Sequence, residues 1–582
     1  MTDYLLGLSI GPVQGFIAAA RRTRDLWFGS HLLSEVSKAA ARAWQKREGR
    51  LVFPAPESSD DLEPNSRLDV GNKLMAIVNT DDPEGFLDVG KEGSRKRWQT
   101  LAEAARDKVK GGVRANIWDR QIGDVLELYG AWVPIGSGAD GYSLARARLE
   151  RLLGARKSTR DFQPAATGFR QEPEFGLPKS SLDAARETVL NEKLSSRFRR
   201  QLGLAPNEQV DCTGLVKRLG GDPEQFPPVT RIALEAWLDQ GDAPDLQAFN
   251  DACEPLVHHR LITRVKPERF ERLSYDGAFL FTSRIEAEAR HLEQGEGDAK
   301  PLLNVLKRLR DDLHNKFGTP TPYFAILVAD GDHIGAFIDE HDDEGAHINL
   351  THALVSFADK ARLVVEKHQG ACVYAGGDDV LALLPIHRAV DCAVAIKNEF
   401  AGVVAPLVVD ATNLPTLSIG LGLGHVLTPF NCLLDLGRRA EKLAKEGPEG
   451  TATEHKRNAL AIVVGVRSGA EIAVRSRWVA PAGQPDIAQR LRIWTSYYRD
   501  ERLSDKTPYD LRAAAVRVAW AEGPVVVQEA SRVLNKKRSE AGTKELSSEV
   551  KVAITDAIKA NGFETTIDEL LVARWLSQEV KN

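Results

Sequence analysis

Two glycines and two aspartates stand side by side in this sequence: Gly376, Gly377, Asp378 and Asp379. The short apolar runs at 371–375 and 380–384 on either side predict a β-hairpin with these four residues at its tip. Glycines let a phosphate approach the backbone, and adjacent carboxylates are hard oxygen ligands that suit Mg²⁺. The tetrad therefore predicts a metal-dependent nucleotidyl-transfer site, and the alternative is an ordinary turn, in which Gly and Asp are common.

A second acidic group precedes the hairpin. The apolar run 323–329 predicts a buried strand, and it leads directly into Asp330, Gly331 and Asp332. Unpaired buried charge is costly, so a cation shared with the hairpin would explain these acids. We expect Asp330, with Asp379 or Asp378, to ligate Mg²⁺ (or Mn²⁺). Asp332 is a further candidate ligand, but it could equally cap the helix that follows.

Regular elements surround these acids and would position them. The apolar spacing over 350–368 predicts an amphipathic helix packed on a sheet. After the hairpin we expect a helix at 389–400, a strand at 417–426, a helix at 432–445 and a strand at 459–466. This order is typical of a palm, which is a mixed sheet with helices covering one face. Lys445, Lys456 and Arg457 follow on or after its last helix, where a cation could reach a γ-phosphate, although an exposed basic helix end is equally expected.

Three motifs together carry a resemblance to a known family. They are Asp-Gly-Asp at 330–332, Tyr-Ala-Gly-Gly-Asp-Asp-Val-Leu-Ala at 374–382, and Ile-Gly-Pro-Val-Gln-Gly-Phe-Ile at 10–17. In these the chain resembles the large subunit of type III CRISPR effector complexes, and more narrowly its Cmr-type (III-B) form. Segments 21–27, 215–219 and 226–229 also fit, so the similarity runs along nearly the whole chain. The tetrad alone is shared with nucleotide cyclases.

The resemblance implies a reaction. The 3′-hydroxyl of one ATP would attack the α-phosphate of another and release pyrophosphate, giving 3′–5′ cyclic oligoadenylates for antiviral defence when guide-bound complexes pair with target RNA. Asp330, Asp378 and Asp379 would be the catalytic acids, and the nucleotide would be bound by Gly331, Gly376, Gly377, Lys445, Lys456 and Arg457. The implied partners are the other subunits of the complex, the guide RNA and the target RNA, in the cytoplasm.

The fold that these observations predict is α+β, with two ferredoxin-like palms. We expect a degenerate first palm at 1–190, a mostly helical middle domain at 191–300, a second palm with the tetrad at 301–470 and a helical domain at 471–582. In the first palm, Ser9-Ile10-Gly11-Pro12 stands where the second has its acids. It therefore cannot hold metals in the same way, and it should supply a nucleotide pocket and an interface.

Composition limits the other classes of function. The formal net charge is −5, so the chain as a whole is not a polycation of the kind that binds nucleic acid. No apolar run approaches the roughly 20 residues of a membrane span. Among local basic stretches, the arginines of 21–24 are the one we expect to contact a phosphate or a partner. The nearest zinc ligands would be Cys212, Cys253, His258 and His259, but they form no defined tetrahedral set, so we predict no zinc.

The sequence also bears on a nuclease domain and on two alternative functions. Many family members carry an HD-type nuclease domain before the first palm, whereas this chain opens on a strand at 4–10, and its His341-Asp342 pair lies in an acidic stretch. We therefore expect DNase activity to be absent. A freestanding nucleotide or dinucleotide cyclase would explain the second palm but not the rest of the chain. A non-catalytic scaffold is the other alternative, against which the intact acids argue.

Overall fold

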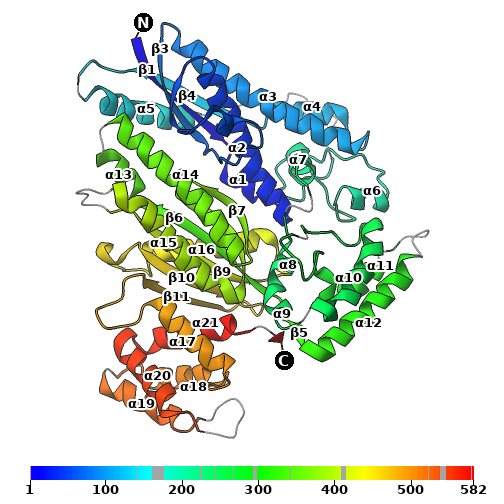
Figure 1. The fold of residues 1–582 in the computed structure, drawn as a ribbon, viewed down its shortest axis with the longest axis vertical. Coiled ribbons are helices and arrows are strands. Elements are labelled where there is room, and N and C mark those ends of the chain that lie inside the picture. The colour runs from blue at the N-terminus through cyan, green and yellow to red at the C-terminus, as the bar shows by residue number, and fades with distance from the viewer. Residues whose placement is uncertain are drawn as a thin grey trace.

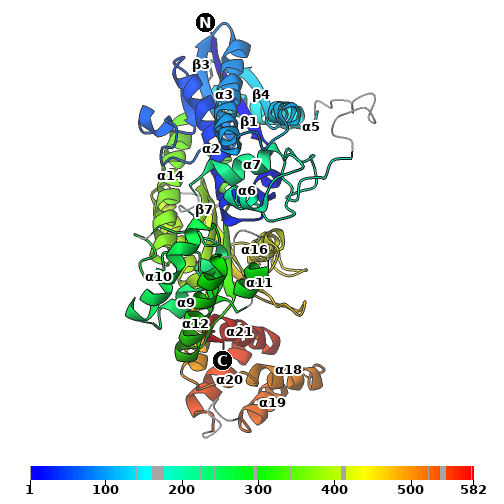
Figure 2. The ribbon, with the colours of Figure 1, turned by 90° about the vertical axis from the view of Figure 1, so that its right-hand side faces the viewer.

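The structure is a computed structural model, and the chain in it is elongated. Its first sheet lies toward one end, its second sheet in the middle and its C-terminal helices at the other end (Figures 1 and 2). The structure describes residues 2–138, 140–159, 176–222, 226–241, 243–266, 268–282, 284–290, 292, 298–340, 343–407, 414–521, 523–537, 545–578 and 580–581. The pair His341-Asp342 therefore lies outside the described residues.

The first sheet has four antiparallel strands in the order β2-β3-β1-β4. Their bounds are β1 Thr2–Gly11, β2 Arg50–Phe53, β3 Lys73–Thr80 and β4 Glu127–Pro134. Alternate residues of β1 face opposite sides. Leu6 and Leu8 pack in the core beneath α2 (Thr23–Gln45) and α3 (Pro83–Val109), whereas Leu5 packs with α5 (Gly141–Ser158) on the other face. The short helices α1 (Gln14–Ala18) and α4 (Ala115–Gly123) complete this part.

The second sheet has six strands in the order β11-β10-β9-β6-β8-β7. The bounds are β6 Tyr323–Asp332, β7 Ala371–Gly376, β8 Asp379–Pro385, β9 Thr416–His425, β10 Ala459–Gly465 and β11 Glu471–Arg477. All neighbours are antiparallel except β9 and β10, which run parallel. The helices are α13 Ile334–Glu340, α14 Glu344–Lys367, α15 Ala389–Val404 and α16 Phe430–Glu446. Each predicted strand and helix of this palm is present, with small shifts at the ends.

The two sheets share one topology. The order β7-β8-β6-β9 in the second repeats β2-β3-β1-β4 in the first, and this is the strand order of a ferredoxin-like fold. The α+β fold with two palms is thus confirmed. The expectation that helices cover one face is wrong: α14 and α15 share the core of one face, whereas α16 packs on Phe324 and Ile326 of the other. A fully buried central strand is apolar on both faces, so its pattern does not limit the helices to one side.

Packing divides the chain somewhat differently from the predicted domains. Helices α6 (Ser196–Gln201) and α7 (Cys212–Gly220) share the core of the first palm, which therefore continues past residue 190. The middle region has its own core, which includes α12. Strand β11 extends the second sheet past residue 470. The middle helices are α8 Val229–Ala233, α9 Glu235–Leu238, α10 Ala243–His258, α11 Arg284–Arg290 and α12 Ala299–Phe317.

The chain ends in a helical bundle. Its helices are α17 Ile487–Arg499, α18 Thr507–Arg517, α19 Pro524–Leu534, α20 Ser548–Asn561 and α21 Phe563–Leu576. Their apolar side chains are continuous with the core of the second palm. The last strand, β12 (Val580–Lys581), pairs with β5 (Thr319–Pro320) just ahead of β6. Among the helices in the described part of the chain, none is long and apolar enough to cross a membrane.

Candidate active site

The fold brings the two predicted acidic groups together. Strand β6 pairs directly with β8, so the end of β6 lies beside the tip of the β7–β8 hairpin. Gly376 pairs with Asp379 across the hairpin, and Gly377 between them has a φ of +63°, a backbone conformation that glycine adopts readily. Asp378 then folds back onto β6: a Cβ atom placed on Gly331 would lie 2.5 Å from its Oδ2 atom.

The acids at this tip raise one another's proton affinity. Burial and the nearby Asp330 carboxylate raise the pKa of Asp378 to about 6. Asp379 still reaches solvent, but the surrounding protein and then Asp378 and Asp330 raise its pKa to about 8. A divalent cation between these carboxylates would remove the repulsion. The donor set therefore fits a hard cation such as Mg²⁺.

Helix α16 adds a cation and a further acid to the same place. Gly420 and Gly422 of β9 carry no side chain, and a Cβ atom on either would lie within 3 Å of the α16 backbone. The helix therefore lies directly on the sheet. Lys445, in its last turn, forms an ion pair with Asp330 and lies 3.5 Å from Glu441. Burial alone would lower the pKa of Lys445, but these two carboxylates outweigh burial and raise it.

Asp332 has a different set of contacts from its neighbour Asp330. Its side chain is 1% exposed, and its carboxylate accepts hydrogen bonds from Thr416 Oγ1 at 2.9 Å and from Ser418 Oγ at 2.8 and 2.9 Å. The backbone N–H of Asn458 donates to it at 2.9 Å. These bonds join β6 to β9 and to the residue before β10. The structure thus gives Asp332 a role in positioning the strands, and these donors belong to neighbouring strands, not to the helix that follows.

The β7–β8 hairpin is also held by a side chain of helix α14. Arg362 of α14 donates from Nη2 to the carbonyl of Ala375, one residue before the tetrad, at 2.7 Å. The same guanidinium forms an ion pair with Asp69 of the first palm. Asp69 lies in the long connection between β2 and β3, the position in the first palm that corresponds to the tetrad in the second. The first palm therefore contacts the β7–β8 hairpin through this pair.

The remaining predicted residues lie at the edge of the site. Gly376 is buried, and a Cβ atom there would meet Tyr374, whereas one on Gly377 would meet nothing within 4 Å. Arg457 donates its backbone N–H to the carbonyl of Lys445 at 2.8 Å, and its Nη1 lies 3.2 Å from His333 Nδ1. Lys456 is exposed beside it.

A preformed metal centre is not found in the described part of the chain. Among those residues, no three His, Cys, Asp or Glu side chains are grouped to hold a metal ion. The ion pair between Lys445 and Asp330 directs that carboxylate toward the lysine, so the acids would have to turn toward a bound cation. Cys212 and Cys253 pack in separate cores, of the first palm and of the middle region. The absence of zinc stays a prediction.

Sequence reasoning missed four residues of this site. Glu441, Arg362, Asp69 and Ser418 all contact or position the acids. Glu441 stands four residues before Lys445, a spacing that places both on one helix face, and this signal could have revealed it. Asp69 and Ser418 act from segments far along the chain, and Arg362 acts from α14, 13 residues before Ala375. No local pattern connects any of the three to the tetrad.

Known proteins resemble this chain in both palms. The family model described as Cas10/Cmr2, second palm domain, matches residues 323–461, and the model described as CRISPR-associated protein Cmr2, N-terminal, matches residues 5–103. The chain is 31% identical over 484 residues to the CRISPR system Cmr subunit Cmr2 of Pyrococcus furiosus, across 68% of this chain and 54% of that protein. It thus spans about half the length of that curated relative.

Solved structures agree in fold. A chain of a type III-B Cmr-beta complex in its apo state matches with a TM-score of 0.64 and 14% identity, over 99% of this chain and 82% of that one. The corresponding structure bound to cognate target RNA matches with a TM-score of 0.65 and 13% identity, over 99% and 83%. At these identities the likeness concerns the fold alone.

Proposed function

The chain belongs to the Cas10/Cmr2 family, in its type III-B Cmr form, and from this membership we propose that its second palm converts ATP to 3′–5′ cyclic oligoadenylates. In this proposal the protein is the large subunit of a guide-RNA complex in the cytoplasm, and pairing with target RNA starts the reaction. Its partners are the other subunits of that complex, the guide RNA and the target RNA.

The observation that carries the proposal is the meeting of Asp330, Asp378 and Asp379 at the end of β6, beside Lys445. With Glu441, four carboxylates stand near one ammonium group. A triphosphate would be repelled from such a surface, so its binding requires a divalent cation. Carboxylates that attract a cation and then a polyphosphate are expected in phosphoryl transfer.

Each residue has a defined part in the proposed reaction. Asp330, Asp378 and Asp379 would hold the divalent cation, which lowers the pKa of the attacking 3′-hydroxyl and neutralises charge on the triphosphate. Gly377 leaves the tip of the hairpin open, so a ribose and its α-phosphate can approach the backbone there, whereas the Tyr374 side chain fills the space beside Gly376.

Other side chains position this machinery. Lys445 lies close enough to balance negative charge on a phosphate once Asp330 turns to the cation. Asp332 holds β6 against β9 and takes no part as a ligand in this scheme.

The proposal is tested by incubating the guide-loaded complex with ATP and Mg²⁺, with and without target RNA, and comparing wild type with Asp378→Ala/Asp379→Ala. We expect target-dependent cyclic oligoadenylates that disappear in the double variant while the complex still assembles. A cyclic dinucleotide made from GTP by the isolated chain would favour the freestanding cyclase. No product under any condition, with assembly intact, would favour the scaffold.

The absence of DNase activity stays a prediction. It is checked by incubating the same complex with single-stranded DNA and Mn²⁺. Degradation that persists in the Asp378→Ala/Asp379→Ala variant would contradict it.

A further inference from the structure

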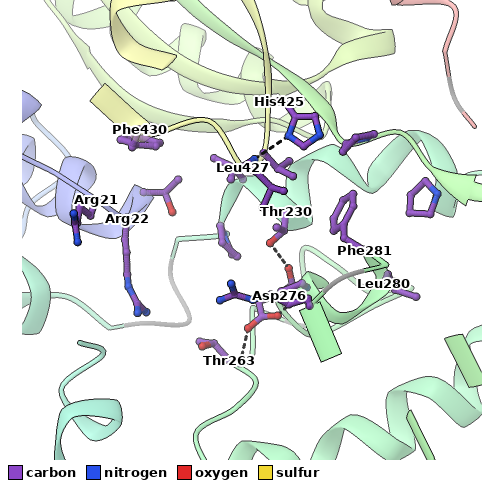
Figure 3. Close-up of a pocket in the computed structure, with 18 of the residues that line it drawn as sticks. Arg21, Arg22, Thr230, Thr263, Asp276, Leu280, Phe281, His425, Leu427 and Phe430 are labelled. Carbon is purple, nitrogen blue, oxygen red and sulfur yellow. Dashed lines mark hydrogen bonds between the residues drawn. The ribbon is translucent and has the colours of Figure 1, made fainter. Parts of the chain in front are cut away.

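A large cavity lies between the first palm, the middle region and the second palm, away from the acidic tetrad (Figure 3). Its volume is about 920 Å³, within the range of cavities that bind small molecules. The wall from the second palm includes Pro322, just before β6, and His425, at the end of β9. Asp330 is seven residues farther along β6 than Tyr323, so the tetrad is about 20 Å away. The two sites are therefore separate.

The walls of this cavity carry a strong excess of positive charge. Five arginines line it, namely Arg21, Arg22, Arg24, Arg284 and Arg467. Of the described residues that line it, Asp276 is the one acidic side chain. Its carboxylate already accepts backbone N–H groups from Thr263 at 2.8 Å and Ala278 at 3.0 Å. Arg284 forms an ion pair at 3.4 Å with Glu288 of its own helix, although its side chain is 53% exposed. The other arginines lack a matching set of acids in the cavity.

The acid that could compensate the first arginines is already paired elsewhere. Asp25 is fully buried and binds Arg218 through two bonds, of 2.5 and 2.7 Å. Solvent reaches Arg22 through the cavity, but the protein around it and then the charge of Arg218 lower its pKa to about 10. The same two causes, with Arg22, lower the pKa of Arg24 to about 9, and Arg24 Nε is buried without a hydrogen-bond partner. An anion in the cavity would relieve this repulsion.

Two long helices begin at the same place. Arg22 directly precedes α2, and Phe430, the first residue of α16, also lines the cavity. The residue before α16 is Pro429, which provides no side-chain hydrogen bond to the first N–H groups of that helix. The N-terminus of a helix favours anions. The first turn of α2 already holds Asp25, whereas the first turn of α16 holds no acid, so α16 adds to the positive potential of the arginines.

The rest of the lining is apolar and aromatic. Phe226, Phe281 and Phe430 contribute to the walls. Phe226 and Phe430 are largely buried in the apolar cluster behind the cavity, whereas Phe281 is half-buried (Figure 3). Leu427 stays 59% exposed at the same place. An anion site needs no aromatic side chains, whereas a nucleotide presents both a phosphate and a flat base. Aromatic faces stack on bases, and arginine guanidinium groups bind phosphates.

We propose that this cavity is a nucleotide-binding site distinct from the tetrad, in which Arg22 and Arg284 bind a 5′-phosphate while the base packs on the aromatic wall. Arg22 and Arg284 line the same cavity, together with Asp276. The shared chemistry is that of a phosphorylated nucleotide, whether it is free or the terminal unit of an RNA strand. The proposal does not depend on the reaction at the tetrad.

The test is calorimetric binding to the full chain in EDTA, since divalent metal is needed at the tetrad but not at this site. The probes are AMP, adenosine, inorganic phosphate and a 5′-phosphorylated single-stranded RNA. We expect AMP to bind more tightly than either adenosine or phosphate. Arg22→Ala/Arg284→Ala should weaken AMP binding at least about tenfold, because it removes two charge-assisted contacts. Binding of the RNA but not AMP, with the same loss, would identify the strand end as the source.

The matched control is Arg95→Ala/Arg148→Ala, which removes two exposed arginines from α3 and α5 and should leave binding unchanged. Thermal melting verifies that both double variants are folded. Asp378→Asn/Asp379→Asn should also bind AMP like wild type in EDTA. The proposal is overturned if neither AMP nor the RNA binds, if adenosine binds as well as AMP, or if binding is lost in the tetrad variant and kept in Arg22→Ala/Arg284→Ala.

Discussion

The missing side chain of Gly331 provides the space in which Asp378 lies. An alanine Cβ at this position would stand 2.5 Å from Asp378 Oδ2 and 2.7 Å from its Cβ, so the aspartate would have to move. Misplacement of a reacting group by about 1 Å can reduce a rate a hundredfold. We expect Gly331→Ala to lower cyclic oligoadenylate formation by at least about tenfold. The measurement is product formed per unit time by the assembled complex at saturating ATP.

Gly335 offers a matched control for this substitution. It lies four residues away in α13, and a Cβ atom there would meet nothing within 4 Å. Gly335→Ala should keep full activity, since it makes the same chemical change without touching an acid. If Gly331→Ala were as active as Gly335→Ala, the proposed position of Asp378 in the reaction would be wrong.

Replacing Asp332 should lower the stability of the fold much more than replacing Asp330. Asp332→Ala removes a buried acceptor and leaves Thr416, Ser418 and the Asn458 N–H without it, so we expect a loss of about 2–4 kcal/mol. Asp330→Ala removes a carboxylate that repels its neighbours, so it should cost little stability. Urea unfolding of both variants without divalent metal measures the difference. Equal stability of the two would contradict a positioning role for Asp332.

Local sequence identifies the candidate ligands more readily than the residues that support them. Asp330, Asp378 and Asp379 are found by local pattern, because acids beside a buried apolar run are costly unless a cation compensates them. The role of Asp332 depends on Thr416, Ser418 and Asn458, which are 84, 86 and 126 residues away in the sequence. Nothing in the local pattern distinguishes it from Asp330, two residues before. Its carboxylate is assigned only when the strand neighbours are known.

Helix α14 connects the first palm to the β7–β8 hairpin through Arg362. The bond to the Ala375 carbonyl fixes the end of β7, and the ion pair with Asp69 joins that strand to the first palm. We expect Arg362→Ala to increase amide hydrogen exchange in residues 374–379 and to reduce activity about tenfold, because the acids would no longer be held in one geometry. Hydrogen exchange followed by mass spectrometry measures the first effect.

The control is Arg438→Ala on α16, whose guanidinium lies 3.8 Å from Asp435 in a pair within its own helix. It should change neither exchange at the hairpin nor activity. Asp69→Asn should produce a smaller effect in the same direction, since the bond to Ala375 remains. Unchanged exchange at 374–379 in Arg362→Ala would show that the hairpin is rigid without this support.

The elements themselves were largely predictable, but their arrangement was less so. Apolar runs and helical spacing predicted the strands and helices of the second palm to within a few residues. These patterns are local, because the period of the apolar residues depends on whether the backbone is a strand or a helix. The face that α16 covers was missed. Gly420, Gly422 and Gly424 recur at every second residue of β9, and this stripe marks the face on which a helix lies directly on the backbone. It was the signal that could have placed α16 and, with it, Lys445.

The two palms have separate main apolar cores, and a smaller apolar cluster and a few polar contacts join them. In this joining cluster, Leu26 of α2 packs with Phe324 and Ile326 of β6. The core of the first palm includes α7, whereas that of the second palm extends into the C-terminal bundle. Between the palms, Tyr142 Oη lies 2.9 Å from His347 Nδ1, and Arg362 pairs with Asp69. Each such contact contributes about 1 kcal/mol, and the apolar cluster that joins the palms is much smaller than the core of either palm. We therefore expect the two halves to unfold separately.

A pair of variants tests this expectation, because each half contains a buried ion pair that can be broken. Arg490 of α17 binds Glu569 of α21 at 2.7 Å, and Arg218 binds Asp25 in the first palm. Removing one partner leaves a buried charge unpaired and costs about 3–5 kcal/mol. Glu569→Ala should therefore speed hydrogen exchange across both the second palm and the bundle, and leave the first palm protected. Arg218→Met should do the reverse.

The size of the energetic loss does not distinguish the two variants, since each substitution deletes one member of a buried ion pair. What differs is which core each pair belongs to. If Glu569→Ala loosened only the bundle, then the shared core would be two cores, and strand β11 would be the boundary between them. If both variants loosened the whole chain equally, then the joining apolar cluster and the polar contacts would couple the palms more strongly than their size implies. In that case a signal could pass from the first palm to the tetrad through this cluster as well as through Asp69 and Arg362.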